Sequence, residues 1–239
     1  MTAAIMDKYP SLKKMSDADY VEEGDGREAR VLAYIESHSS IAEARGNPTR
    51  ILRLMDEFAA QEDFLISVGV YKERVLTGIV AAAAPRVLVE LGGYIGYSAI
   101  LFTTAMKRAL ELKQEYADVA VKIIELAELS DTVKIVVGSA DESLRRLKDD
   151  GKLSKEHGID VLFLDHVESL YEWEVKVVDE ELGLLKAGAL VLADNVVRPG
   201  APDYVKYVRA HPRYHSHGVE VLIVPGELED AIEVTRIKK

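Results

Sequence analysis

Oxygen-bearing side chains end two apolar runs of this chain. The run VLFLDH ends in Asp165 and His166, and the run GALVLADN ends in Asp194 and Asn195. If both runs are neighbouring parallel strands, their carboxyl ends meet at one edge of a sheet, where open α/β sheets bind ligands. Two carboxylates and an amide are hard oxygen ligands of the kind that Mg²⁺ takes. A single Asp at a strand end is more often a helix N-cap, but two acids and an amide together favour a metal site.

A second candidate site follows the short apolar run RVLVEL. Glu90-Leu91-Gly92-Gly93-Tyr94-Ile95-Gly96 comes next, and glycines at such a point let the backbone approach a ligand and turn into a helix. The spacing departs from the G-x-G-x-x-G of dinucleotide sites, because Tyr94 stands where the second glycine would. Glu90 would repel a pyrophosphate and suits a cationic or zwitterionic ligand. A tight structural turn explains such a motif about as well when it stands alone.

An acid also follows at the distance of a ribose contact. Glu111 lies 19 residues after Gly92, and an acid at about this spacing accepts hydrogen bonds from ribose hydroxyls. Alone, Glu111 would be a solvated residue at a strand end. Together with the glycine turn, it favours a ligand that contains a nucleoside.

The elements that must position these residues alternate along the chain. Apolar residues at three-to-four spacing predict helices over 27–38, 49–64, 70–84, 97–109, 114–129, 142–150 and 171–185. Short apolar runs predict strands at 86–91, 109–112, 132–140, 160–166 and 188–195. This order predicts a parallel sheet with helices on both faces. The runs 217–224 and 231–237, separated by PGELED, predict an antiparallel hairpin at the sheet edge.

Length and composition limit the class of protein. The 239 residues suffice for one large α/β domain, expected over 28–239 with a helical cap at 28–84 and a sheet core at 85–239. The polar residues 1–27 would form a mobile arm or a loosely packed cover. The net charge of -11 without a Lys/Arg cluster disfavours nucleic acid. No apolar run approaches the ~20 residues of a membrane span.

The absence of cysteine excludes disulfides, thiolate metal sites and Cys nucleophiles. The N-terminus has no apolar core of signal-peptide length. We therefore expect a cytoplasmic protein that acts on a small molecule, without nucleic acid or membrane as partner. A monomer is favoured, although nothing in the sequence fixes the oligomeric state.

At the residues described above, the sequence resembles the catechol O-methyltransferase family of class I S-adenosylmethionine-dependent methyltransferases. The resemblance runs from about residue 50 to the C-terminus and is carried by VLVELGGYIGYSA, LFLDH, ELGLLKAGALVLADNVVRPGAPDY and LEDAI. It implies a Rossmann-like fold with a seven-stranded, mostly parallel sheet and an antiparallel C-terminal hairpin. It also implies Mg²⁺-dependent transfer of a methyl group from S-adenosylmethionine to one hydroxyl of a catechol.

Carried over position by position, the resemblance implies three groups of site residues. The metal ligands would be Asp165, Asp194 and Asn195. The cofactor-binding residues would be Val68, Glu90, Gly92, Tyr94, Tyr97, Ser98, Glu111, Ala140, Asp141, Asp165 and His166. Among these, Glu90, Gly92, Tyr94 and Ser98 would contact the methionine part of the cofactor, and Ala140, Asp141 and His166 would lie at its adenine. The substrate-binding residues would be Phe64, Asp165, Val167, Asn195, Pro199 and Glu220, with Glu220 holding the second catechol hydroxyl.

One departure from the family pattern concerns the general base. The family has a lysine three residues after the metal-binding Asp, and here that position is Glu168. An ordinary Glu has a pKa of about 4.3, against roughly 10 for Lys. Glu168 is therefore a base with a raised pKa, an outer partner of the metal, or a surface residue.

The other departure is a deletion. Only 12 residues separate Ser98 from Glu111, whereas the family usually has several more. These residues must hold a helix and the second strand, so one of the two is short. These two departures motivate an alternative function, in which the chain keeps the fold, has weakened or lost catalysis and acts as a ligand-binding protein. A nicotinamide dehydrogenase is disfavoured because the dinucleotide fingerprint is missing.

Overall fold

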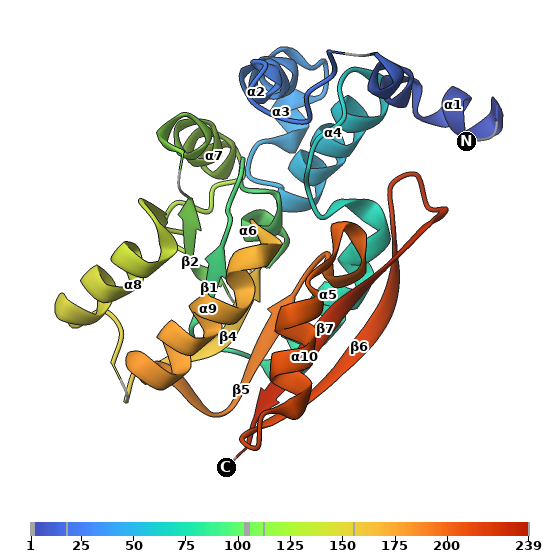
Figure 1. Ribbon diagram of the computed structural model, residues 1–239. Helices are drawn as coiled ribbons and strands as arrows, with labels where there is room; N and C mark the ends of the chain where they lie inside the picture. Colours follow the sequence, from blue (N-terminus) through green and yellow to red (C-terminus); the bar gives the residue numbers. More distant parts are fainter. Residues whose placement is uncertain (1–2, 18, 103–105, 112, 155, 239) are drawn as a thin grey trace.

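A seven-stranded sheet forms the centre of the protein, in the strand order β3-β2-β1-β4-β5-β7-β6 (Figure 1). The computed structural model describes residues 3–17, 19–102, 106–111, 113–154 and 156–238. The strands are β1 Leu88–Leu91, β2 Met106–Glu111, β3 Ile135–Val137, β4 Ile159–Leu164, β5 Leu185–Ala193, β6 Tyr214–Ile223 and β7 Leu228–Ile237. β1 to β5 run parallel, and β7 runs antiparallel to β5 and β6. The predicted fold class and C-terminal hairpin are confirmed.

Helices cover both faces of this sheet (Figure 1). One side carries α2 Arg27–Ser37, α3 Ile41–Ala44, α4 Pro48–Gln61, α5 Gly69–Ala83, α6 Tyr97–Leu101 and α7 Gln114–Leu126. The other side carries α8 Ala140–Asp149, α9 Tyr171–Lys176, the π-helical turn η3 Val177–Glu181 and α10 Pro202–Ala210. The short turns η2 Glu168–Leu170 and η4 Val196–Gly200 follow β4 and β5. None of the helices within the described ranges is long and apolar enough to cross a membrane.

Side-chain alternation along the strands divides the interior into two cores. In β4, Val161 and Phe163 join the core beneath α2 and α4 to α7, whereas Leu162 and Leu164 join the core beneath α8 to α10. A strand that is apolar on both faces is typical of a parallel sheet covered on both sides. This arrangement leaves the carboxyl ends of the strands as the place where polar side chains can gather.

The segment after the glycine turn differs from its predicted form. A helix was expected over 97–109, but α6 ends at Leu101 and Met106 already lies in β2; residues 103–105 and Leu112 lie outside the described part. The short interval between Ser98 and Glu111 therefore leaves a helix of five residues, while β2 has six. Pairing of β2 with both β1 and β3 satisfies its backbone and overrides the local helical pattern.

The described residues of the predicted arm, which precede α2, pack against the helices that follow them. They include the short helices α1 Ala3–Lys8 and η1 Pro10–Ser16. Tyr9 and Leu12 are buried, and Ser11 Oγ donates to the Ala59 carbonyl of α4 at 2.6 Å. At the expected boundary, the buried Arg27 donates to the Phe64 carbonyl at 2.7 Å. The division of the chain at residue 27 stays a prediction.

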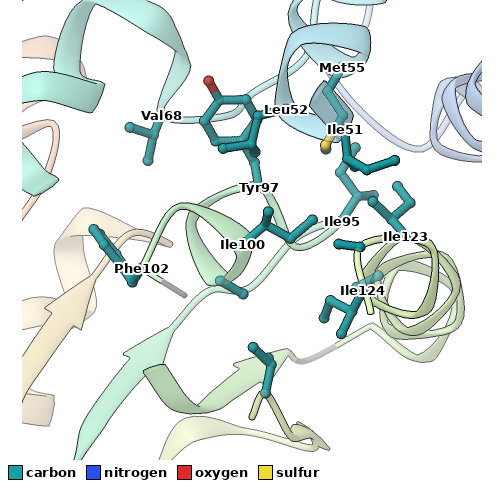
Figure 2. Packing of buried hydrophobic residues seen from close by; sticks show 14 of the residues in the cluster. Ile51, Leu52, Met55, Val68, Ile95, Tyr97, Ile100, Phe102, Ile123 and Ile124 are labelled. Atoms are coloured by element: carbon teal, nitrogen blue, oxygen red, sulfur yellow. The ribbon is translucent and has the colours of Figure 1, made fainter. Parts of the chain in front are cut away.

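The first core depends on close packing between α4, α6 and α7, and Figure 2 shows their side chains meeting. Ile51 and Met55 of α4, Ile100 of α6 and Ile124 of α7 are all buried. Their packing fixes the helix that follows the glycine turn.

We expect Ile124→Ala to lower the free energy of unfolding by about 2–5 kcal/mol, because it opens a cavity in this core. Val121→Ala on the same helix is the matched control, since Val121 is 41% exposed, and it should change stability by no more than about 0.5 kcal/mol. Urea denaturation measures both values. Equal losses in the two variants would contradict the packing described here.

Candidate active site

The predicted acids meet at the carboxyl edge of the sheet. Asp165 follows β4, and its backbone N–H donates to the Leu91 carbonyl of β1 at 2.9 Å. Asp194 follows β5, and its N–H donates to the Leu164 carbonyl of β4, also at 2.9 Å. Burial raises the pKa of Asp165 well above its usual range, and the nearby charge of Asp194 adds to the shift. The structure therefore brings the two predicted carboxylates into one electrostatic unit.

A lysine that the sequence analysis missed reaches this unit from α5. Lys72 is 2% exposed, and its Nζ lies 2.7 Å from Asp194 Oδ1 and 2.8 Å from Asp230 Oδ2. Burial alone would lower the pKa of Lys72, but the two carboxylates raise it above its usual value, so it stays charged. Its position carries a sequence signal, because Lys72, Leu76 and Val80 form the buried stripe of the helix at four-residue spacing.

Asp230, on β7, was also missed as a site residue. Its side chain is fully buried, and its Oδ1 accepts from the backbone N–H groups of Val197 at 3.1 Å and Arg198 at 3.0 Å. The side-chain amide of Asn195 lies 3.5 Å from its Oδ2. Asp230 thus contacts the segment that carries the predicted ligand Asn195 and the predicted substrate contact Pro199.

The oxygens left over at this edge fit a divalent cation. Asp194 Oδ1 is taken by Lys72 and by the N–H of Asn195, which leaves Oδ2 outside these bonds. Asn195 donates Nδ2 to the Arg198 carbonyl at 2.9 Å, so its Oδ1 is the end available to a ligand. The carboxylate of Asp165 accepts no hydrogen bond within the described ranges. Such a set of oxygen donors from carboxylates and an amide suits Mg²⁺.

The predicted donor set includes an amide as well as carboxylates. Among the described residues, no three His, Cys, Asp or Glu side chains gather into a metal site. The predicted site therefore consists of two carboxylates and one amide oxygen, with its other positions left to water or substrate oxygens.

Gly92 has a structural reason to be glycine. Its φ is +96°, and an added Cβ would lie 2.2 Å from the carbonyl oxygen of Asp165 and 2.7 Å from the Cβ of His166. A side chain at Gly92 would therefore displace the end of β4 that carries the predicted metal ligand. This observation supports a structural explanation for the turn; close approach of the protein backbone to a ligand at this glycine stays a prediction.

Glu90 offers an unpaired oxygen beneath the turn. The residue is fully buried, Ser98 Oγ donates to Oε1, and Oε2 has no hydrogen-bond partner within the described ranges. Burial raises the pKa of Glu90 well above its usual value, and the charges of Asp165 and Glu111 raise it further. A cationic group from a ligand would satisfy Oε2, which agrees with the predicted contact to the methionine part of the cofactor.

Hydrogen bonds of Glu111 and Tyr94 to other residues of the protein hold the glycine turn in place. Glu111 accepts from the backbone N–H of Tyr94 at 2.7 Å and from that of Lys113 at 2.8 Å. The hydroxyl of Tyr94 donates to Glu28 of α2 at 2.9 Å. The ribose role of Glu111 stays a prediction, and a ribose would have to share this carboxylate with the two amides.

Tyr97 and Val68, also predicted to bind the cofactor, lie on the side of the cap. The hydroxyl of Tyr97 donates to Asp56 of α4 at 3.2 Å. Burial raises the pKa of Asp56 to about 7. Val68 is buried at the start of α5.

The remaining predicted cofactor residues lie beyond β3 and β4. Ala140 opens α8 after β3, and Asp141 pairs with Arg145 at 2.7 Å. His166 Nε2 lies 2.6 Å from the buried Glu174 Oε2, out of line for a hydrogen bond. The ring of the predicted adenine contact His166 therefore lies next to Glu174, a residue that the sequence analysis missed.

The predicted substrate residues are only partly brought together. Val167, which directly precedes η2, is exposed, and η4 carries Pro199. Phe64 lines a cavity of about 330 Å³ whose described walls do not include Val167, Pro199 or Glu220. Glu220 is exposed on β6, and its Cα pairs with that of Ala231.

Glu168 faces the acid cluster. It is half-buried, and burial raises its pKa above the usual value for a glutamate. The charges of Asp194 and Asp230 act in the same direction. Three roles were predicted for Glu168: a base, an outer partner of the metal, or a surface residue. Its half-buried position near Asp194 and Asp230 supports the role of a surface residue least.

Comparison with known proteins bears on the family. The family profile described as O-methyltransferase matches residues 43–220. The bovine catechol O-methyltransferase is 30% identical over 215 residues, which cover 88% of this chain and 76% of that protein. A probable O-methyltransferase of Mycobacterium tuberculosis is 35% identical over 195 residues, covering 78% of this chain and 80% of the relative.

Solved structures agree on the fold. An O-methyltransferase from Bacillus cereus, determined in complex with SAH, superposes with a TM-score of 0.67 at 19% identity, covering 98% of this chain and all of that one. The family match extends over most of the chain, and the resemblance seen at the glycine turn and the strand ends is confirmed. The chain belongs to the O-methyltransferase family.

Proposed function

We propose that the protein transfers a methyl group from S-adenosylmethionine to a hydroxyl of a catechol-type substrate, in a reaction that depends on Mg²⁺. Family membership and the catechol O-methyltransferases among the relatives support the reaction class. The single observation that carries the metal and substrate assignments is the donor set of Asp165, Asp194 and Asn195 at the carboxyl edge of the sheet, in which Oδ2 of Asp194 and Oδ1 of Asn195 lie outside the hydrogen bonds described above.

The side chains have distinct roles in this proposal. Asp165, Asp194 and Asn195 would hold Mg²⁺, which when bound lowers the pKa of a catechol hydroxyl and fixes its orientation. Glu90 would receive the cationic part of S-adenosylmethionine, whose sulfonium supplies the methyl group. The buried carboxylates provide a negative, water-poor environment at the edge of the sheet, so their interactions with charge are stronger than in water.

Glu168 is the proposed proton acceptor. Its raised pKa moves it closer to the range in which a carboxylate works as a general base near neutral pH. Because Glu168 lies near Asp194 and Asp230, it could instead contact the metal indirectly, through a ligand of the metal. The lysine of the family pattern is absent at this position.

A second function, binding without turnover, is motivated by the shortened α6 and by Glu168. Five residues form one and a half turns of helix after the glycine turn. Such a protein would bind S-adenosylmethionine in calorimetry and yield no methylated product.

The proposed reaction is tested by methyl transfer to a simple catechol with Mg²⁺ and then with EDTA, across pH 6 to 9. We expect product with Mg²⁺ and none with EDTA. Asp194→Ala should also abolish turnover, because it removes a metal ligand. Asp203→Ala is the control, since Asp203 is exposed on α10, and it should keep wild-type activity. Unchanged turnover in Asp194→Ala, with the fold checked by thermal melting, would contradict the assignment of Asp194 as a metal ligand.

Glu168→Gln should lower kcat by about 10²-fold or more with little change in KM, as expected for loss of a general base. Glu172→Gln, which removes a carboxylate paired with Lys176 within α9, serves as the control and should leave kcat unchanged. If Glu168→Gln instead weakens Mn²⁺ binding and spares kcat at saturating metal, the outer-contact role replaces the base role.

Glu220→Gln should weaken catechol binding more than cofactor binding, because the proposed role of Glu220 is to hold the second hydroxyl. Calorimetric titration with each ligand gives the two dissociation constants. Glu227→Gln, in the exposed turn of the same hairpin, should change neither. Equal weakening of both ligands in Glu220→Gln would argue against a substrate role.

A further inference from the structure

The buried pair of Lys72 and Asp230 joins two elements that are far apart in the sequence. Lys72 belongs to α5 and Asp230 to β7, 158 residues later. Neither side chain is a proposed metal ligand, yet both are buried at the metal edge. Burying two charged groups is costly unless each is paired and hydrogen-bonded. Their contacts show what this pair does for its neighbours.

Strand direction explains why Asp230 reaches this place. β7 runs antiparallel to β5, and Ala193 at the end of β5 pairs with Glu233. The beginning of β7 therefore extends beyond the end of β5, alongside the segment that follows it. Asp230 lies at this point with its carboxylate directed at the backbone of that segment.

The segment 194–200 needs such an anchor because its backbone changes direction twice. Asn195 adopts a left-handed conformation with φ of 58°, and Arg198 is extended with φ of -137° and ψ of 112°. Between these two changes of direction, Asp230 accepts hydrogen bonds from the backbone N–H groups of Val197 and Arg198. The same segment donates Nδ2 of Asn195 to the Arg198 carbonyl, which orients the amide.

Lys72 completes the arrangement from the other side. Its single ammonium binds Asp194 Oδ1 and Asp230 Oδ2, so the first residue of the segment and its anchor are tied to the same group. The N–H of Asn195 also donates to Asp194 Oδ1. These bonds engage Oδ1 and leave Oδ2 of Asp194 for another ligand.

We propose that Lys72 and Asp230 are positioning residues that hold the 194–200 segment in the conformation in which Asp194 and Asn195 present their oxygens beside Asp165. This inference rests on the proposed metal site and extends it to two residues that touch neither metal nor substrate. Outer-shell partners of this kind typically change metal affinity by 10–100-fold when removed.

The test uses a double variant that keeps the net charge. Lys72→Met combined with Asp230→Leu removes one positive and one negative charge together, so any loss of metal affinity comes from positioning. Glu229→Gln is the control, because it alters the exposed neighbouring acid of β7. Asp230→Asn is the milder variant, since its amide oxygen can still accept from Val197 and Arg198.

Two measurements are made on the metal-free, full-length protein and then with Mn²⁺ alone. Hydrogen–deuterium exchange reports on the backbone amides of 194–200, and electron paramagnetic resonance follows Mn²⁺ binding. In the double variant we expect at least tenfold faster exchange and a Mn²⁺ dissociation constant raised by about 10–100-fold, with the melting transition still cooperative. Asp230→Asn should show smaller changes in the same direction, and Glu229→Gln none.

The outcomes separate this inference from the proposed function. Wild-type exchange and wild-type Mn²⁺ affinity in the double variant would overturn the positioning role. If the double variant does not fold, wild-type values for both measurements in Asp230→Asn overturn it instead. A wild-type protein that binds no Mn²⁺ would count against the proposed metal site, and the exchange of 194–200 would still decide whether the pair holds the segment.

Discussion

Buried negative charge at the carboxyl edge of the sheet is the constraint on which the rest of the site depends. Burial raises the pKa of Asp165, and the charges of Asp194, Glu168 and Asp230 raise it further, whereas the charge of Lys72 acts in the opposite direction. One ammonium does not balance these carboxylates. A fold that keeps them together is suited to a further cation, and the proposed Mg²⁺ and sulfonium chemistry are both of that kind.

The architecture supplies this edge from several parts of the chain. Parallel pairing of β1, β4 and β5 aligns the ends that carry the glycine turn, Asp165 and Asp194. Antiparallel insertion of β7 next to β5 brings the beginning of a strand, and with it Asp230, to the same edge. An all-parallel sheet would place the beginning of that strand at the opposite edge.

The glycine turn combines structural and binding requirements. Gly92 is needed because the backbone of Asp165 lies where its Cβ would be, so the turn and the proposed metal ligand are packed against each other. Glu111 ties the turn to β2 through the N–H of Tyr94. Glu90 then remains beneath the turn with one oxygen unpaired. Shortening of α6 leaves this arrangement intact, because the contacts that fix the turn come from β2 and β4.

The sequence by itself determined the class of fold and the acids that end β4 and β5. Apolar runs of strand length report which residues are buried and where a strand stops, so Asp165, Asp194 and Asn195 could be found from local pattern alone. The same local information failed at 97–109, where pairing of β2 with β1 and β3 outweighed a helical pattern. It also left the role of Glu168 open among three alternatives.

Only the tertiary structure decided which groups face these acids. Lys72 lies 122 residues before Asp194 and 158 before Asp230, and a helical stripe shows that Lys72 is buried without showing its partner. Likewise, the hydrogen bonds from two backbone amides to Glu111 and the proximity of His166 to Glu174 depend on how the elements pack. Periodicity specifies the face on which a side chain lies, whereas the partner on that face is set by sheet order and strand direction, which long-range contacts determine.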